Sequence, residues 1–378
     1  MRLQIWAALA VAGWLSACAG QAPSRPDLAT APPRPGPPEM GARALWFQPE
    51  PLAVPDLSPP ATGAFAALQG WAQDDHAAAL AAFAATCGAA RSAEAATVCR
   101  RAQALGPQPE SVARAFLETN FRPEPVAESG LLTAYFMPIY EARTQPDDEF
   151  RAPVRPRPAD LPAQIVPGDY PARAEIEARQ PNDAVAWMRP EELFFLQVQG
   201  SGVLLFPDGV RQRAVFDGTN GAPFVGIAAP LRRQGLLADS ATSGEAIRTW
   251  LAANRGPRAQ AIMQLNPRYV FFRLRADDGG EPAGAAGVPL VAGRAVAVDP
   301  SRHAMGDLVW IDATSPVLSG AFPCYRRLVV ALDTGGAIKG EARADLYMGR
   351  GSAAGVEAGR VRHVLRLYRL TPIGRAGA

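Results

Sequence analysis

The last third of this chain is a series of short β-branched runs separated by turn residues. Between Arg294 and Leu370 these runs read RAVAVDP, DLVWID, YRRLVVALD and HVLRLYRL. Runs of this length and composition predict β-strands, and their spacing leaves little room for long helices. The 35 glycines and 37 prolines also favour many turns over a helical bundle. A small β-barrel is therefore the predicted core of the fold.

The chain before this region is mixed. From Gly63 to about Phe121, apolar residues recur every three or four positions, which predicts helices. The spacing of apolar residues changes at Gly130, where GLLTAYFM predicts a strand that ends at Pro138. Residues 193–216 are interpreted as three strands joined by two turns. Residues 242–256 predict a helix, with Thr242 and Glu245 spaced as a capping box.

The N-terminus predicts a secretory signal peptide over residues 1–17. One arginine precedes an apolar run that is too short to span a membrane, and small residues follow it. Leu15-Ser16-Ala17-Cys18 resembles a bacterial lipobox, which implies cleavage before Cys18 and lipidation of that cysteine. The alternative is an ordinary signal peptide with an unmodified cysteine. Residues 18–60 are rich in proline and predict an extended linker.

Export into an oxidising compartment would allow disulfides to form. Cys87 and Cys99 lie twelve residues apart in the alanine-rich helical region, with a possible break between them. Two interpretations stay open here. The cysteines either form a disulfide that joins two helices, or they are two buried thiols.

Several chemistries are excluded by what the sequence lacks. The three histidines, His76, His303 and His363, are scattered without metal-ligand spacing, so no metal site is expected. There is no G-x-S-x-G elbow and no glycine-rich phosphate loop, so no cofactor is expected. A net charge of +2 argues against nucleic acid as a partner. The sequence ALDTGG is similar to an aspartic protease motif, but no second copy exists to complete that site.

Carboxylates remain as candidate catalytic groups. Asp299 and Asp333 each end a predicted strand, and Asp345 lies in ARADLYMG. Aspartates are common in turns because their side chains bond to the nearby backbone. Three of them in one β-rich segment favour a site over that simpler explanation. Lys339, the only lysine in the chain, lies between two of these aspartates.

The segment DTGGAIKGEARADLYMG resembles the signature loop of the membrane-bound lytic murein transglycosylase A family. QVQGSGVLLFPDG, NPRYVFFR and VPLVAGRAVAVDP are similar to family segments in the same order. The resemblance covers about Gly130 to Pro372, with a helical lead-in from about Gly63. The last part resembles the three-aspartate domain, whose defining positions here are Asp299, Asp333 and Asp345.

The resemblance implies a mainly β fold in which a double-psi β-barrel carries an inserted β domain. Residues 61–136 would hold the helical lead-in and the first part of the barrel. Residues 137–275 would form the inserted domain, and residues 276–378 the rest of the barrel. A groove between the domains would take a glycan strand of peptidoglycan.

The resemblance also implies an activity and a location. The enzyme would be a polysaccharide lyase that cleaves the bond between N-acetylmuramic acid and N-acetylglucosamine and leaves 1,6-anhydro ends. It would be lipid-anchored at the periplasmic face of the outer membrane of a Gram-negative bacterium, in possible contact with cell-wall synthesis or division proteins. A non-catalytic murein-binding lipoprotein on the same fold is the rival interpretation. That rival predicts loss of the acid, and Asp345 is present.

By the match, Asp345 is the single catalytic acid, and Asp333 supports it. Substrate contacts are expected at Tyr135, Gln199, Gly200, Ser201, Gly202, Asn220 and Asp299. Phe136, Met137, Phe224 and Val225 depart from residues usual in the family, which changes the expected details of glycan contact. Lys339 is expected to pair with Asp333 and hold it charged, so that Asp345 keeps the proton. The alternative is that this lysine is an accident of codon usage.

Overall fold

The computed structural model describes residues 63–238, 243–316, 318 and 320–373, which lie in the compact unit Pro60–Ala378. The predicted signal peptide, Cys18 and the proline-rich linker fall outside the described residues. Among the described helices, none is long and apolar enough to cross a membrane.

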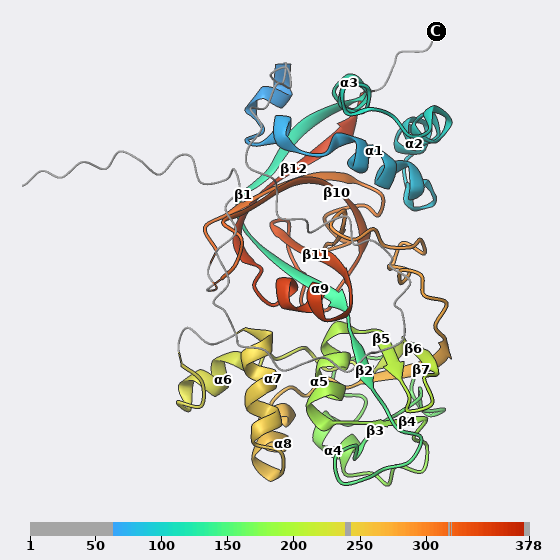
Figure 1. Ribbon diagram of the computed structural model, residues 1–378, viewed down its shortest axis with the longest axis vertical. Coiled ribbons are helices and arrows are strands. Elements are labelled where there is room, and N and C mark those ends of the chain that lie inside the picture. Colours follow the sequence, from blue (N-terminus) through green and yellow to red (C-terminus); the bar gives the residue numbers. More distant parts are fainter. Residues whose placement is uncertain (1–62, 239–242, 317, 319, 374–378) are drawn as a thin grey trace, which may run out of the picture. The chain divides into compact units, whose positions relative to one another are not determined.

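A closed six-stranded barrel forms the larger sheet, in the order β1-β11-β8-β10-β9-β12. Figure 1 labels β1, β10, β11 and β12 of this barrel. Its strands are β1 (Phe121–Met137), β8 (Ala295–Ala297), β9 (Leu308–Thr314), β10 (Cys324–Asp333), β11 (Arg343–Arg350) and β12 (Arg362–Pro372). The short helix α9 (Gly351–Ala358) follows β11. The predicted fold class is confirmed, because the molecule is mainly β. Four of the six barrel strands, β8, β9, β10 and β12, coincide with the β-branched runs of the sequence.

Alternation along β11 divides its side chains between two environments. Ala344, Leu346 and Met348 belong to a core cluster that also contains Leu132 of the neighbouring β1. Successive side chains of a strand point to opposite faces, so Asp345 points away from that cluster. The two strands run parallel and are in register, with Thr133 opposite Asp345.

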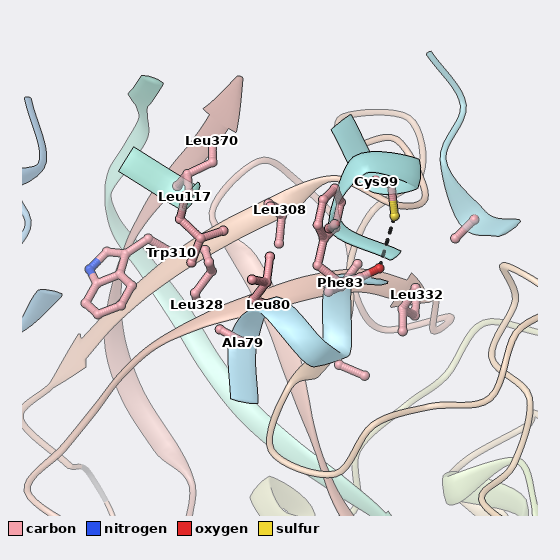
Figure 2. Close-up of a cluster of buried hydrophobic side chains, with 14 of the residues drawn as sticks. Ala79, Leu80, Phe83, Cys99, Leu117, Leu308, Trp310, Leu328, Leu332 and Leu370 are labelled. Carbon is pink, nitrogen blue, oxygen red and sulfur yellow. Dashed lines mark hydrogen bonds between the residues drawn. The ribbon is translucent and has the colours of Figure 1, made fainter. Parts of the chain in front are cut away.

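Three helices precede the barrel and pack against it: α1 (His76–Ala85), α2 (Ala93–Leu105) and α3 (Glu110–Asn120). Figure 2 shows the contact, where Leu80 and Phe83 of α1 meet Leu308, Trp310 and Leu328 of the barrel. Cys87 and Cys99 form a disulfide with a Cα–Cα distance of 5.5 Å. It joins the turn after α1, where Cys87 lies, to Cys99 in α2. The Cys99 sulfur lies 3.1 Å from the Phe83 carbonyl oxygen (Figure 2).

A second sheet is built from the chain between β1 and β8. Its order is β2-β5-β6-β7, from β2 (Ile139–Glu141), β5 (Gly202–Leu205), β6 (Arg211–Thr219) and β7 (Val270–Ala276). A smaller pair consists of β3 (Ala152–Val154) and β4 (Ala186–Met188). The helices of this region are α4 (Arg173–Glu177), α5 (Pro190–Gln199), α6 (Ala228–Arg233), α7 (Gly244–Ala253) and α8 (Pro257–Gln264).

Two local predictions were wrong. The segment expected as the first of three strands is the helix α5, which has Pro190 at its first position and ends at Gly200 in the left-handed conformation. Its apolar run is buried, and such a run cannot be told from a buried strand by periodicity alone. In α7 the cap is Ser243, whose hydroxyl accepts from the Ala246 amide, so the capping box assigned to Thr242 and Glu245 was off by one residue. Thr242 itself lies outside the described residues.

Candidate active site

Asp345 lies on β11 beside β1, and its nearest polar contact is Thr133. The Thr133 hydroxyl donates a hydrogen bond to Asp345 Oδ1. Arg343, two residues earlier on β11, donates from Nη2 to the same hydroxyl at 2.8 Å. The arrangement follows from strand geometry, because residues two apart on one strand share a face. Asp345 is therefore held by one direct contact, with a cation placed behind it.

Asp333 ends β10 and is held by three donors. The Tyr135 hydroxyl donates to its Oδ2 at 2.8 Å, while the Ala285 and Thr334 amides donate to its Oδ1 at 3.0 and 2.9 Å. The Tyr135 ring also lies 5.2 Å from the Tyr347 ring, between centroids. Tyr135 thus links β1 to the end of β10, two residues along from Thr133.

Burial controls the electrostatics of this cluster. Desolvation raises the pKa of the Asp345 carboxyl, and the charge of Asp333 raises it further. The Thr133 hydrogen bond and the Arg343 charge oppose this rise. Burial also raises the pKa of Asp333, against the effect of its three donors. A carboxyl with a raised pKa can hold a proton closer to neutral pH, which a general acid requires.

Asp299 has a different environment, although it was expected to contact substrate. It is buried, and its oxygens accept from the Gly340 amide at 2.7 Å and from the Ser301 amide and hydroxyl at 3.0 and 2.8 Å. These bonds, led by the one from Gly340, lower the pKa of Asp299 to about 2. Asp299 therefore fastens the turn after β8 to the loop after Lys339, and direct contact with a sugar is not favoured.

The predicted pairing of Lys339 with Asp333 is wrong. Lys339 is exposed, and its charge lowers the pKa of Asp299. The oxygens of Asp333 are occupied by Tyr135 and two backbone amides instead. The amide of Gly340, next to Lys339, bonds to Asp299, so the loop is tied to Asp299 at this point. No feature of the sequence could reveal this contact.

Some of the predicted substrate contacts lie beside Tyr135, and others are packing residues. Gln199 Oε1 accepts from the Phe136 amide at 3.1 Å, which places the turn Gln199-Gly200-Ser201 against the end of β1, next to Tyr135. Gly202 is buried because β5 approaches Pro138 closely, and an added Cβ would lie 2.6 Å from a Leu196 methyl carbon. Gly202 is therefore a packing residue.

Asn220 was also expected in the groove, and that expectation was wrong. Its side chain is 0% exposed. The amide nitrogen donates to the carbonyls of Pro171 and Pro267, both at 2.9 Å, and its oxygen accepts from the Tyr269 amide at 2.8 Å. Asn220 thus ties three segments together and has no surface to offer a sugar.

Sequence reasoning missed two residues beside Asp345, Thr133 and Arg343. Both lie two positions from a residue that was selected, Tyr135 and Asp345 respectively. The period of two along a strand was the available signal. Within the described residues, no group of three histidine, cysteine or acidic side chains is arranged to hold a metal ion.

Two family models match the chain. The MltA specific insert domain matches residues 131–273, and the 3D domain matches residues 294–371. A crystal structure of a membrane-bound lytic murein transglycosylase from Agrobacterium tumefaciens is 33% identical, with a TM-score of 0.71. That match covers 82% of this chain and 96% of the other. The chain belongs to the lytic murein transglycosylase A family.

Two further relatives extend the comparison. Membrane-bound lytic murein transglycosylase A of Vibrio cholerae is 34% identical over 251 residues, which are 64% of this chain and 65% of that protein. The match thus spans slightly less than two thirds of that curated relative. A crystal structure of Escherichia coli MltA with bound chitohexaose has a TM-score of 0.65 at 25% identity, and covers 84% of this chain and 93% of the other.

Proposed function

We propose that this protein is a lytic transglycosylase that cleaves peptidoglycan strands between N-acetylmuramic acid and N-acetylglucosamine without water. The products would carry 1,6-anhydro ends, and the reaction would serve remodelling and recycling of the cell wall. Family membership supports the reaction class. The Escherichia coli relative bound to chitohexaose supports a glycan as the substrate.

The observation that carries the proposal is the desolvated carboxyl of Asp345, held by Thr133. Protonated, Asp345 donates to the oxygen that links the two sugars. The bond from C1 of the muramoyl sugar to that oxygen breaks, and the N-acetylglucosamine leaves with a free hydroxyl. The 6-hydroxyl of the muramoyl sugar forms the new bond to C1, and the ionised Asp345 accepts the proton of that hydroxyl. The nucleophile belongs to the substrate, so proximity replaces the second carboxylate of an ordinary glycosidase.

Asp333 supports this chemistry without attacking the sugar. Three donors fix its carboxylate at the end of β10, which leaves it poorly placed to move toward C1. Its charge raises the pKa of Asp345 and so favours the protonated acid. Arg343 acts in the other direction and stabilises Asp345 once the proton has left.

The organisation around the acid follows the family. The barrel domain comprises residues 61–136 and 276–378, and residues 137–275 form the inserted domain. Tyr135 and the turn Gln199-Gly200-Ser201, which meet at the end of β1, line the glycan path. Lipidation of Cys18 would hold the body at the periplasmic face of the outer membrane, with residues 18–60 as tether.

The test is mass spectrometry of purified sacculi digested with the protein. Anhydro ends weigh one water less than the reducing ends left by hydrolysis. We expect anhydro muropeptides as the dominant product. Reducing ends in their place would show a hydrolase, and intact sacculi would show a murein-binding protein without this activity.

A further inference from the structure

Arg268 is a half-buried cation with no carboxylate partner among the described residues. It precedes β7 in the sequence NPRYVFF. Its only side-chain hydrogen bond there is a long one, from Nη1 to the Ala222 carbonyl at 3.4 Å. Burial lowers the pKa of its guanidinium, and no carboxylate opposes that effect.

The two most deeply buried arginines of the same region, Arg155 and Arg173, are paired. Arg155 forms an ion pair with Asp183, and Arg173 forms one with Glu177 at 3.2 Å. A cation removed from water without a partner costs free energy, so buried charges in proteins are usually paired. Arg268 departs from this rule, which indicates that its partner comes from outside the chain.

The position of Arg268 connects it to the catalytic loop. Its guanidinium carbon lies 3.5 Å from where a Cβ of Gly336 would be. Gly336 is three residues after Asp333, in the turn that Asp333 begins. A cation here faces the segment that carries the aspartates, and the glycine leaves space in front of it.

The same residue is tied to an exposed aromatic side chain. Asn266 Oδ1 accepts from the Arg268 amide at 3.3 Å and from the Val225 amide at 3.1 Å. Val225 follows Phe224, and the two are 40% and 38% exposed. The link thus places an apolar platform and an unpaired cation on neighbouring loops, a combination that suits a sugar bearing an anionic substituent.

We propose that Arg268 binds a carboxylate of the muramoyl unit and thereby distinguishes murein from uncharged glycans of the same backbone. This inference rests on the proposed function. N-acetylmuramic acid differs from N-acetylglucosamine by a lactyl ether. In a bare strand that ether ends in a carboxylate, and in a peptide-bearing strand the carboxylates belong to the peptide. A guanidinium fork matches a carboxylate with two parallel hydrogen bonds.

The experiment measures binding in the Asp345→Asn background, so that strands are not cleaved. Three ligands are compared: soluble peptide-bearing strands, strands whose peptides an amidase has removed, and chitohexaose. Arg268→Gln removes the charge, Arg268→Lys keeps it without the fork, and Arg151→Gln removes an exposed charge of the same region as a control.

We expect Arg268→Gln to raise the Kd of a carboxylate-bearing strand about ten- to hundredfold, the range for a hydrogen bond to a charged group. Arg268→Lys should lie between that variant and the parent. The Kd of chitohexaose should not change, and Arg151→Gln should match the parent throughout. An effect confined to peptide-bearing strands would place the carboxylate on the peptide, and one confined to bare strands would place it on the lactyl group.

The inference is overturned if Arg268→Gln leaves every Kd unchanged, or if it weakens chitohexaose as much as the charged strands. The second result would give Arg268 a structural role in the loop. Circular dichroism of each variant separates misfolding from a binding defect. Failure of the proposed function has another signature, the absence of anhydro ends in digests by the unmodified protein, and the binding comparison remains decisive in that case.

Discussion

The barrel holds aspartates in two regions whose pKa values shift in opposite directions. One region contains Asp345 and Asp333, and the other contains Asp299 and the turn that follows it. Asp345 receives one hydroxyl donor and is desolvated, so its pKa rises. Asp299 receives three donors, two of them backbone amides, and its pKa falls to about 2. Asp333 receives the same kinds of donors as Asp299, yet desolvation still raises its pKa. The balance between desolvation and donors therefore decides which aspartate can hold a proton.

The two regions therefore differ in role, since one can exchange a proton and the other holds the chain together. A carboxyl whose desolvation outweighs its hydrogen-bond donors has an anion of high free energy, so it can hold a proton and give it up. A carboxylate whose donors outweigh its desolvation is stable as an anion and serves as an anchor for the chain. Asp333 has three donors, and desolvation still raises its pKa. In its ionised form it raises the pKa of Asp345 through its charge.

The largest effect should come from Asp345→Asn. An asparagine can still accept the Thr133 hydrogen bond, so the fold should be kept, but it has no proton to give. Loss of a general acid should reduce kcat by roughly 100-fold or more. Release of anhydro muropeptides from sacculi measures this loss, and chitohexaose binding checks the site. If a tenth or more of the activity remains, Asp345 is not the acid.

Asp333→Asn should give a smaller loss and a shift in pH dependence. The acid works only while protonated, so activity falls as the pH rises through the pKa of Asp345. Because the Asp333 charge raises that pKa, its removal should move the alkaline limb of the pH–rate profile to lower pH. We expect a loss of roughly tenfold at neutral pH, since coupling within one network is worth about 1 to 2 kcal/mol.

Tyr135→Phe is the matched control for this variant, because it removes one donor from Asp333 and keeps the carboxyl group. The lost donor raises the pKa of Asp333 further, so the alkaline limb should move less than in Asp333→Asn. A profile that does not move in Asp333→Asn would contradict the role given to that charge.

Much of the barrel could be predicted from the sequence because its strands are short, apolar and bounded by turns. The runs that contain Val296, Trp310 and Val329 lie in β8, β9 and β10, as the pattern predicts. The helix α5 was missed because consecutive residues from Leu193 to Gln197 are all buried, so its sequence lacks the periodicity that distinguishes a helix from a strand. Only the proline at its start and the glycine at its end carried the right signal.

The site was predictable in part, for a related reason. Motif resemblance pointed to Asp345 and Tyr135, which the structure brings into one cluster with Asp333. The exact partners depended on tertiary contacts between residues far apart in the chain, 212 positions for Thr133 and Asp345 and 47 to 49 positions for Asn220 and its partners. Thr133 beside Asp345 and Asn220 beneath the loops are such cases, because strand register and burial decide whether a polar side chain faces substrate or the chain itself.

Asp299→Asn should affect acid stability more than catalysis. A carboxyl whose pKa is lowered on folding stabilises the folded state above its ordinary pKa of 3.8, and this contribution is lost as the pH falls toward about 2. The unmodified protein should therefore have a higher Tm than the variant at neutral pH, with a gap that narrows from pH 4 to pH 2. Calorimetry across that range measures it. A difference in Tm that stays constant with pH would show that Asp299 is not held as an anion. A loss of kcat as large as that of Asp345→Asn would show that Asp299 takes part in catalysis.

The smallest effect is expected at Lys339. The lysine is exposed and acts on Asp299 only through its charge, so Lys339→Arg should retain activity within about twofold and leave the pH–rate profile unchanged. Lys339→Met removes the charge and should raise the pKa of Asp299, which narrows the acid-stability gap slightly without moving the limb assigned to Asp345. Both variants are compared with Asp333→Asn in the same pH series. If Lys339→Met shifts the alkaline limb as Asp333→Asn does, the charge of Lys339 acts on the pKa of Asp345 or Asp333. The two regions would then not be electrostatically separate.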